Sequence, residues 1–337
     1  MRPTKRLVPA VPRQDHLGIG AAHENLRSWH NAAMGHDDDH AAGRAEDRGR
    51  LRVVLAVTVV VMAVEVVGAL LTGSLALLAD AGHMATDAAA VVLALGASYV
   101  ASRGGGPRST FGLHRAEILA ALVNALALLV VCGYLAWAGI SRLADPVSVD
   151  AGPMVAFAAV GLVANAVSLV ILNRSETGSL NLRGAANEVF ADLVGSVLAV
   201  LAGAVIWVWG LDRADPIASL VIAALILPRS LVLLRESAAI LLEVAPRGLD
   251  LDDVRRHLLA MPGVLDVHDL HAWTITSGMP SLSAHVTVTE EALAELGVGG
   301  VLDRLSECTA EHFDVRHSTF QVEPVTHREH EDLGEVH

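Results

Sequence analysis

The chain has 337 residues, of which 53% are hydrophobic and only 18% are charged. A soluble protein carries about a quarter charged residues. Aromatic residues make up only 4%, so the apolar excess suits lipid-buried helices rather than a β-barrel with aromatic girdles. The net charge is −13, and residues 243–337 hold 18 acidic and 6 basic side chains. This acidity excludes nucleic acid and anionic lipid as partners of that segment, because both would repel it.

Residues 1–50 lack apolar periodicity and are expected to form a disordered cytoplasmic leader. They contain a His/Asp tract, residues 36–40, with three further histidines upstream. Such tracts bind divalent metals loosely. An unstructured solubilising tail is the other interpretation of the same composition, and the two stay open.

Six apolar runs follow, each long enough to cross the membrane, since a helix needs about 20 residues to span the hydrocarbon. We expect spans at 51–72, 75–101, 116–142, 152–173, 185–210 and 215–234, within a transmembrane domain of residues 51–242. An even number of spans places both termini on one side. Arginines concentrate in the leader, in loops 103–115 and 174–183 and after the sixth span, so both termini are expected to be cytoplasmic. The predicted location is the plasma membrane.

Residues 243–325 have the pattern of a small soluble domain. We expect a helix at 251–260, strands at 264–276 and 281–289, a helix at 299–312 and a strand at 316–323. This order predicts a compact α+β domain with helices on one face of the sheet, close to a ferredoxin-like half. Residues 326–337 are expected to be a flexible tail. The predicted fold class is thus an all-α membrane bundle of six helices with a small cytoplasmic α+β domain.

Two pairs of ionisable side chains lie inside the spans at the same spacing. His83 and Asp87 in the second span, and Glu188 and Asp192 in the fifth, are each four residues apart, which places each pair on one helix face. One such pair could equally lock helix packing. Two pairs carry up to three negative charges, which a cation must neutralise in hydrocarbon. One imidazole and three carboxylates predict a tetrahedral metal site between the two helices.

Other polar residues of the membrane region support weaker hypotheses. Asp80 lies one turn before His83 on nearly the same face. Glu65 lies mid-span, where a helix contact and a transport role are both open. His114, in the loop that enters the third span, is a candidate for a second, weaker metal site, although an ordinary loop histidine is the other interpretation.

The C-terminal domain offers its own candidate ligands. Strand residues two or four apart share a face, and neighbouring strands lie about 4.8 Å apart. His268, His285 and Glu323 on the three predicted strands could therefore meet, across the sheet or across a dimer interface. A surface histidine is the simpler interpretation of any one of them alone. His271 and Trp273 have packing as an alternative role.

These patterns together resemble the cation diffusion facilitators, particularly the zinc/cadmium/cobalt exporters. The resemblance covers residues 51–325 and rests on five segments: SLALLADAGHMATDA at 74–88, FGLHRAEILAALVN at 111–124, NLRGAANEVFADLVGSV at 181–197, DPIASL at 215–220 and VHDLHAW at 267–273. It implies a homodimeric, proton-coupled antiporter that exports divalent metal from the cytoplasm, most of all Zn²⁺ and also Cd²⁺ and Co²⁺. It further implies metal as substrate and as a regulatory ligand, and no enzymatic cofactor.

The resemblance also assigns the transport site to His83, Asp87, Glu188 and Asp192. Family members of this type usually have His at the position of Glu188. A carboxylate there hardens the site and favours Mn²⁺, Co²⁺ or Fe²⁺ relative to a His-rich site, so an exporter that prefers those ions stays open. Protons compete with metal for the same ligands, and no P-loop motif for ATP is present.

Two functions from other classes are weighed against export. A membrane-anchored metal sensor or scaffold would not need ionisable pairs within the membrane. An intramembrane metalloprotease would need a motif such as H-E-x-x-H, which the sequence lacks. The chain is therefore expected to be a transporter and not an enzyme.

Overall fold

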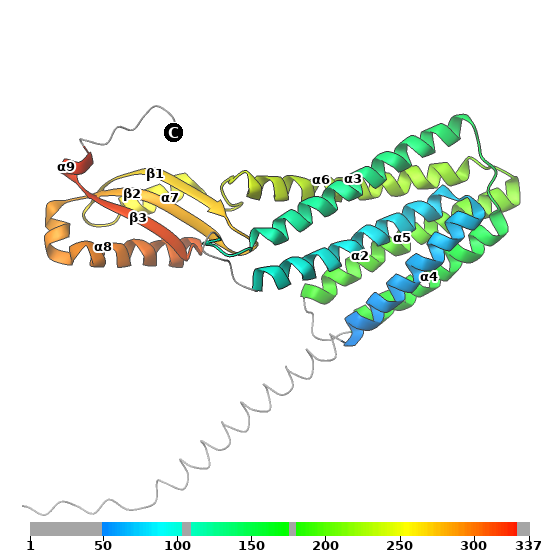
Figure 1. The fold of residues 1–337 in the computed structure, drawn as a ribbon, viewed down its shortest axis with the longest axis horizontal. Coiled ribbons are helices and arrows are strands. Elements are labelled where there is room, and N and C mark those ends of the chain that lie inside the picture. The colour runs from blue at the N-terminus through cyan, green and yellow to red at the C-terminus, as the bar shows by residue number, and fades with distance from the viewer. Residues whose placement is uncertain (1–48, 103–108, 175–179, 329–337) are drawn as a thin grey trace, which may run out of the picture. The chain divides into compact units, whose positions relative to one another are not determined.

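The computed structural model describes residues 49–102, 109–174 and 180–328 (Figure 1). Six described helices are long and apolar enough to cross a membrane. They are Gly49–Thr72, α2 (Leu75–Ser102), α3 (Arg115–Ala144), α4 (Ala151–Asn173), α5 (Leu180–Trp209) and α6 (Ala214–Leu241). The expected six-helix membrane fold is confirmed. The leader up to residue 48 and the tail from residue 329 lie outside the described residues.

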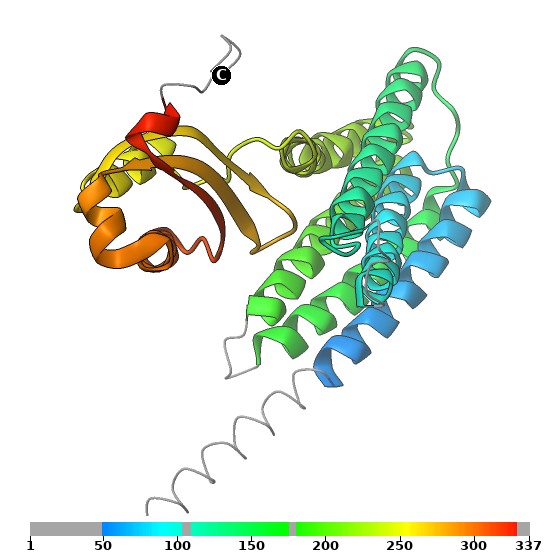
Figure 2. The same cartoon turned by 60° about the vertical axis from the view of Figure 1, so that its left-hand side comes forward.

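The described residues divide into two compact units, which take residues 49–58 and 164–191 in the first and residues 59–163 and 192–328 in the second, apart from the stretches outside the described residues. The first unit has its own small core of Val54, Leu172, Leu182 and Val189. In the second unit, α2, α3 and α6 pack against one another, as Figures 1 and 2 show. Buried alanines are frequent at this packing, and small side chains let helix backbones approach closely where lipid provides no hydrophobic drive.

The turn between the first helix and α2 is built on Gly73. Its φ is +71°, a left-handed conformation that glycine adopts without a steric penalty. The Gly73 N–H donates to the Ala69 carbonyl oxygen at 2.9 Å, which is the usual way a glycine ends a helix. The chain therefore reverses direction within two residues and α2 begins at Leu75.

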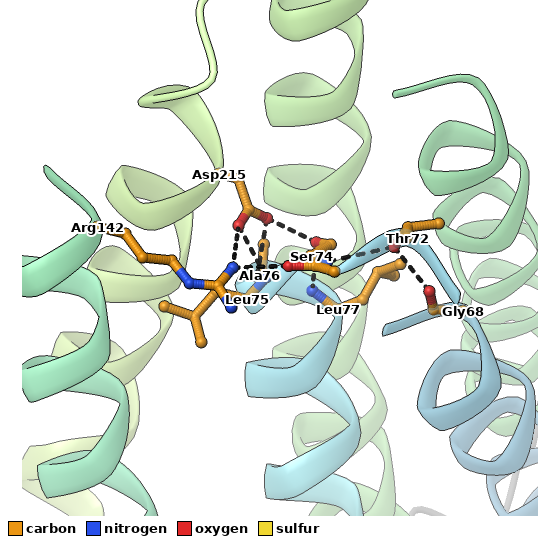
Figure 3. Close-up of polar contacts among 9 residues, drawn as sticks. Gly68, Thr72, Ser74, Leu75, Ala76, Leu77, Arg142 and Asp215 are labelled. Atoms are coloured by element: carbon orange, nitrogen blue, oxygen red, sulfur yellow. Dashed lines mark hydrogen bonds and ion pairs between the residues drawn. The ribbon is translucent and has the colours of Figure 1, made fainter. Parts of the chain in front are cut away.

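The start of α2 is capped by Asp215, which belongs to the first turn of α6 and is fully buried. One carboxylate oxygen accepts from the Ser74 hydroxyl at 2.6 Å and from the Ala76 N–H at 3.0 Å, and the other accepts from the Leu75 N–H at 2.7 Å (Figure 3). The first N–H groups of any helix lack partners within it. A carboxylate from another helix therefore supplies the cap of α2.

Arg142, in the last turn of α3, completes this junction. Its Nη1 donates to the Gly73 carbonyl oxygen at 2.6 Å and lies 3.7 Å from Asp215 Oδ2 (Figure 3). The guanidinium thus balances the charge of the buried carboxylate. One polar junction ties α2, α3 and α6 together at the end of the membrane region where α2 begins.

The C-terminal domain contains α7 (Leu251–Leu259), β1 (Val264–Thr274), β2 (Pro280–Val288), α8 (Glu290–Phe313), β3 (His317–Pro324) and α9 (Val325–Arg328). The strand order is β1-β2-β3, with β1 and β2 antiparallel and β2 and β3 parallel. Helices α7 and α8 contact each other and cover one face of the sheet (Figure 1). The expected small α+β domain is confirmed.

One element differs from the expectation from sequence, because α8 begins at Glu290 rather than at 299. Thr289 caps this helix, since its side chain accepts from the Ala292 N–H at 3.2 Å. Gly297 has a φ of +68° and interrupts the helical backbone. The interruption leaves a first part too short to show helical periodicity in the sequence.

Candidate metal centres

The first candidate centre brings α2 and α5 together within the membrane region. His83 Nε2 lies 3.4 Å from Asp87 Oδ2 on its own helix and 3.9 Å from Asp192 Oδ1 on α5. The i,i+4 spacing on α2 is what sets Asp87 one turn from His83 on one face. One imidazole nitrogen therefore faces two carboxylates, from two different helices.

The side chains of this centre are buried or largely buried. His83 is 5% exposed and Asp192 2% exposed, and the Asp87 side chain is 21% exposed. Glu188 is half-buried and lies on α5 one turn before Asp192, on the same face of that helix. Buried carboxylates in an apolar surrounding need a cation. Imidazole nitrogen and carboxylate oxygen are donors that zinc and its neighbours in the first transition series accept.

A second polar group lies further along the same helices. Asp80, on α2, is 1% exposed and accepts from the Ser196 hydroxyl on α5 at 3.1 Å. Glu65 of the first helix is 0% exposed and lies beside Asp80. The sequence shows no partner for Glu65. The partner lies on another helix, and only packing reveals it.

The second candidate centre lies on the sheet of the C-terminal domain. His268 of β1 is directly opposite His285 of β2, and Glu323 lies on β3. His268 Nε2 is 3.5 Å from Glu323 Oε2, and His285 Nδ1 is 3.1 Å from Glu323 Oε1. Ligand atoms of the three residues all lie within 4.8 Å of one another. Of the two geometries open from sequence, the three residues meet across the sheet of a single chain.

Two carboxylates that the sequence analysis did not single out lie behind these histidines. His268 Nδ1 is 3.2 Å from Asp266 Oδ2, and His285 Nε2 is 3.6 Å from Asp269 Oδ2. Histidines that bind metal usually place their other ring nitrogen against such a partner, which fixes the ring and its tautomer. The signal was present in the sequence as the alternation of Asp and His between residues 266 and 271.

A β-bulge positions Asp269. The register of β1 against β2 shifts between His268 and His271, and Asp269 has a φ of +48°. A bulge bends the strand and re-aims the side chains beside it, and a non-glycine residue in a left-handed conformation is strained unless its surroundings hold it. The Asp269 carboxylate also lies 2.8 Å from His271 Nε2. The carboxylate of the strained residue Asp269 thus lies against the imidazoles of both His271 and His285.

The remaining predicted ligand, His114, is the residue before α3 and occupies its N-cap position. In the described part of the chain it joins no group of three or more ligand side chains. The structure therefore keeps it apart from both centres. His271 likewise stays outside the cluster of His268, His285 and Glu323 and pairs with Asp269 instead.

Comparison with known proteins gives a match for the transmembrane region and another for the C-terminal domain. The family model of the cation efflux transmembrane domain matches residues 51–242, and that of the cation efflux protein cytoplasmic domain matches residues 246–325. The chain is 40% identical over 294 residues to the metal cation efflux system protein CzcD of Cupriavidus metallidurans, covering 86% of this chain and 90% of the relative.

Two further relatives cover the chain equally well. The zinc transporter ZitB of Escherichia coli is 40% identical over 295 residues, which are 86% of this chain and 93% of the relative. The cadmium, cobalt and zinc/H⁺-K⁺ antiporter of Bacillus subtilis is 35% identical over 299 residues, 87% and 93% of the two chains. A solved structure of the metal-bound C-terminal domain of CzcD is 41% identical and covers 22% of this chain and 99% of that one, with a TM-score of 0.20.

The family match agrees with the six described helices that are long and apolar enough to cross a membrane. The chain belongs to the cation diffusion facilitator family of multi-pass membrane proteins that export metal cations.

Proposed function

We propose that the chain is a proton-coupled antiporter that exports Zn²⁺, and also Cd²⁺ and Co²⁺, from the cytoplasm. The observation that carries this proposal is the placement of His83 Nε2 against the carboxylates of Asp87 and Asp192 inside the membrane region. Glu188, one turn before Asp192, completes the set as the fourth ligand. A site of this charge and burial has no use in a membrane anchor.

Coupling to protons follows from the chemistry of the ligands. A metal binds imidazole and carboxylate only in their deprotonated forms, so protons and metal compete for the same atoms. An imidazole titrates near neutral pH, with an ordinary pKa of about 6.5. When the site opens alternately to the two sides of the membrane, protons that enter from outside displace the metal, and the metal that enters from the cytoplasm displaces protons.

The metal preference depends on Glu188. The relatives are named for zinc, or for cadmium, cobalt and zinc, which supports the same ions here. One imidazole and three carboxylates form a harder donor set than one with a second imidazole, and such a set favours Mn²⁺, Co²⁺ or Fe²⁺. A preference for these ions is therefore the second candidate, and Glu188 is the residue that favours it.

The C-terminal domain has a separate role in this proposal. His268, His285 and Glu323 bind a second, regulatory metal ion, and the domain holds two chains together as a homodimer. The domain and both termini face the cytoplasm of the plasma membrane. The arginine-rich loops support this orientation, and the acidic composition of the domain attracts cations.

Flux through purified protein in proteoliposomes tests the proposal. Zn²⁺, Cd²⁺, Co²⁺, Mn²⁺ and Fe²⁺ are compared one at a time under an imposed pH gradient. We expect gradient-driven uptake that is lost in Asp87→Ala and kept in Asp145→Ala, an exposed carboxylate outside the centre. Metal binding without gradient-driven flux in the wild-type protein would refute the antiporter and favour the sensor.

A further inference from the structure

Glu65 and Asp80 form a carboxyl pair that the metal centre does not use. Both side chains are buried, at 0% and 1% exposure, and they lie close enough for one to hydrogen-bond to the other if a proton is placed between them. Asp80 also accepts from the Ser196 hydroxyl. Among the described residues, Ser196 is the donor close to Glu65, and its hydroxyl donates to Asp80, so neither oxygen of Glu65 has a well-aligned partner. One serine hydroxyl carries a single proton, so it cannot satisfy two buried carboxyl groups at once.

Two glycines shape the space that the pair occupies. A Cβ added at Gly161 on α4 would collide with Glu65 Oε1, and a Cβ at Gly195 on α5 would collide with Asp80 Oδ1. Alanine at either position would therefore displace a carboxyl group.

The charges that face the pair are all negative. The charged groups that interact with Glu65 are Asp80 and Asp192, and the one that interacts with Asp80 is Glu65. Ser196, which is uncharged, lies beside both. No Arg, Lys or His among the described residues is a partner of either carboxyl group. Asp215, another buried carboxylate of the spans, has Arg142 beside it. Two adjacent carboxyl groups without a cation cannot both be ionised, so such a pair shares a proton.

We propose that Glu65 and Asp80 are a proton-binding site, separate from the metal ligands, that carries one of the protons exchanged for metal. This inference rests on the proposed antiport. In the metal-free state the proton lies between an oxygen of Glu65 and an oxygen of Asp80. When metal enters, the proton leaves as H⁺, because the two positive charges of the metal beside Asp192 lower the electrostatic cost of a second negative charge on the pair.

Asp192 links the two sites through its charge. It faces the metal position beside His83 and acts electrostatically on Glu65. Metal that binds at Asp192 removes the negative field that holds the proton on the pair, so the proton is released. By thermodynamic reciprocity, a proton that binds to the pair weakens metal binding by the same factor. Proton binding and metal binding therefore oppose each other, as an antiporter requires.

The test counts protons released per zinc bound, with the full-length protein in detergent, weak buffer and a pH indicator. We expect Glu65→Gln and Asp80→Asn each to release one proton fewer per zinc than the wild-type protein, while zinc still binds at the centre formed with His83. Asp215→Asn is the matched control, since it removes another buried carboxylate that an arginine already balances. Its proton count is expected to equal that of the wild type.

The outcomes separate this inference from the antiport itself. Variants that release as many protons as the wild type would overturn the proton site, even if the wild type is an antiporter. A wild-type protein that releases no proton on binding zinc, and shows no flux driven by a pH gradient, would instead overturn the antiport on which the inference rests.

Infrared difference spectroscopy keeps the test valid if a variant fails to fold. The wild-type protein is expected to lose a carboxylic acid C=O band when zinc is added, because the shared proton leaves the pair. Glu65→Asp retains a carboxyl group and is expected to shift this band rather than abolish it. A wild-type spectrum in which zinc removes no carboxylic acid band would overturn the proposal.

Discussion

Asp215→Ala tests how much the junction at the start of α2 contributes to stability. The substitution leaves the buried N–H groups of Leu75 and Ala76 without acceptors and Arg142 without its counter-charge. Each orphaned buried donor costs about 1–3 kcal/mol. We therefore expect a loss of about 4 kcal/mol from the two backbone donors together, which is a large part of the stability of a typical domain.

The assay is thermal unfolding of the purified full-length protein in detergent at a fixed scan rate. A loss of this size is expected to lower the unfolding midpoint by about 6 °C. Asp215→Asn keeps one side-chain oxygen as an acceptor and is expected to lose less. Asp145→Ala, at an exposed carboxylate near the end of α3, is the control and is expected to leave the midpoint unchanged. An unchanged midpoint in Asp215→Ala would refute the argument that this cap stabilises α2.

Three further predictions concern the metal centres. Asp192→Ala is expected to abolish metal flux in proteoliposomes while the protein still elutes as a folded dimer, and an active variant would remove Asp192 from the site. Glu188→His softens the donor set, so competition assays should show a shift toward Zn²⁺ and away from Mn²⁺ and Co²⁺; unchanged selectivity would mean that Glu188 is not a ligand. Glu323→Gln removes the carboxylate between His268 and His285, and equilibrium dialysis should find one zinc ion fewer per chain, whereas an equal zinc content would argue against a metal site on the sheet.

Much of the membrane region can be predicted from the sequence, because the length of a span and the face on which a residue lies depend only on neighbouring residues in the chain. Span lengths follow from the thickness of the hydrocarbon and the rise of a helix. The spacing of His83 and Asp87, and of Glu188 and Asp192, fixes which residues share a helix face. The order of helices and strands in the C-terminal domain likewise follows from periodicity. The exception is the first part of α8, which a left-handed Gly297 separates from the rest.

The tertiary structure decided which helices and strands meet. Asp215 caps a helix that begins 140 residues earlier in the chain, and Asp80 accepts a hydrogen bond from a serine 116 residues away. The bulge that aims Asp269 at His285 also has no signal in hydrophobic periodicity. The sequence by itself determined the spans and the ligand pairs, because covalent spacing sets helix faces. Only packing decided the partners of the buried charges, because a partner on another helix or strand depends on how the elements approach one another and not on distance along the chain.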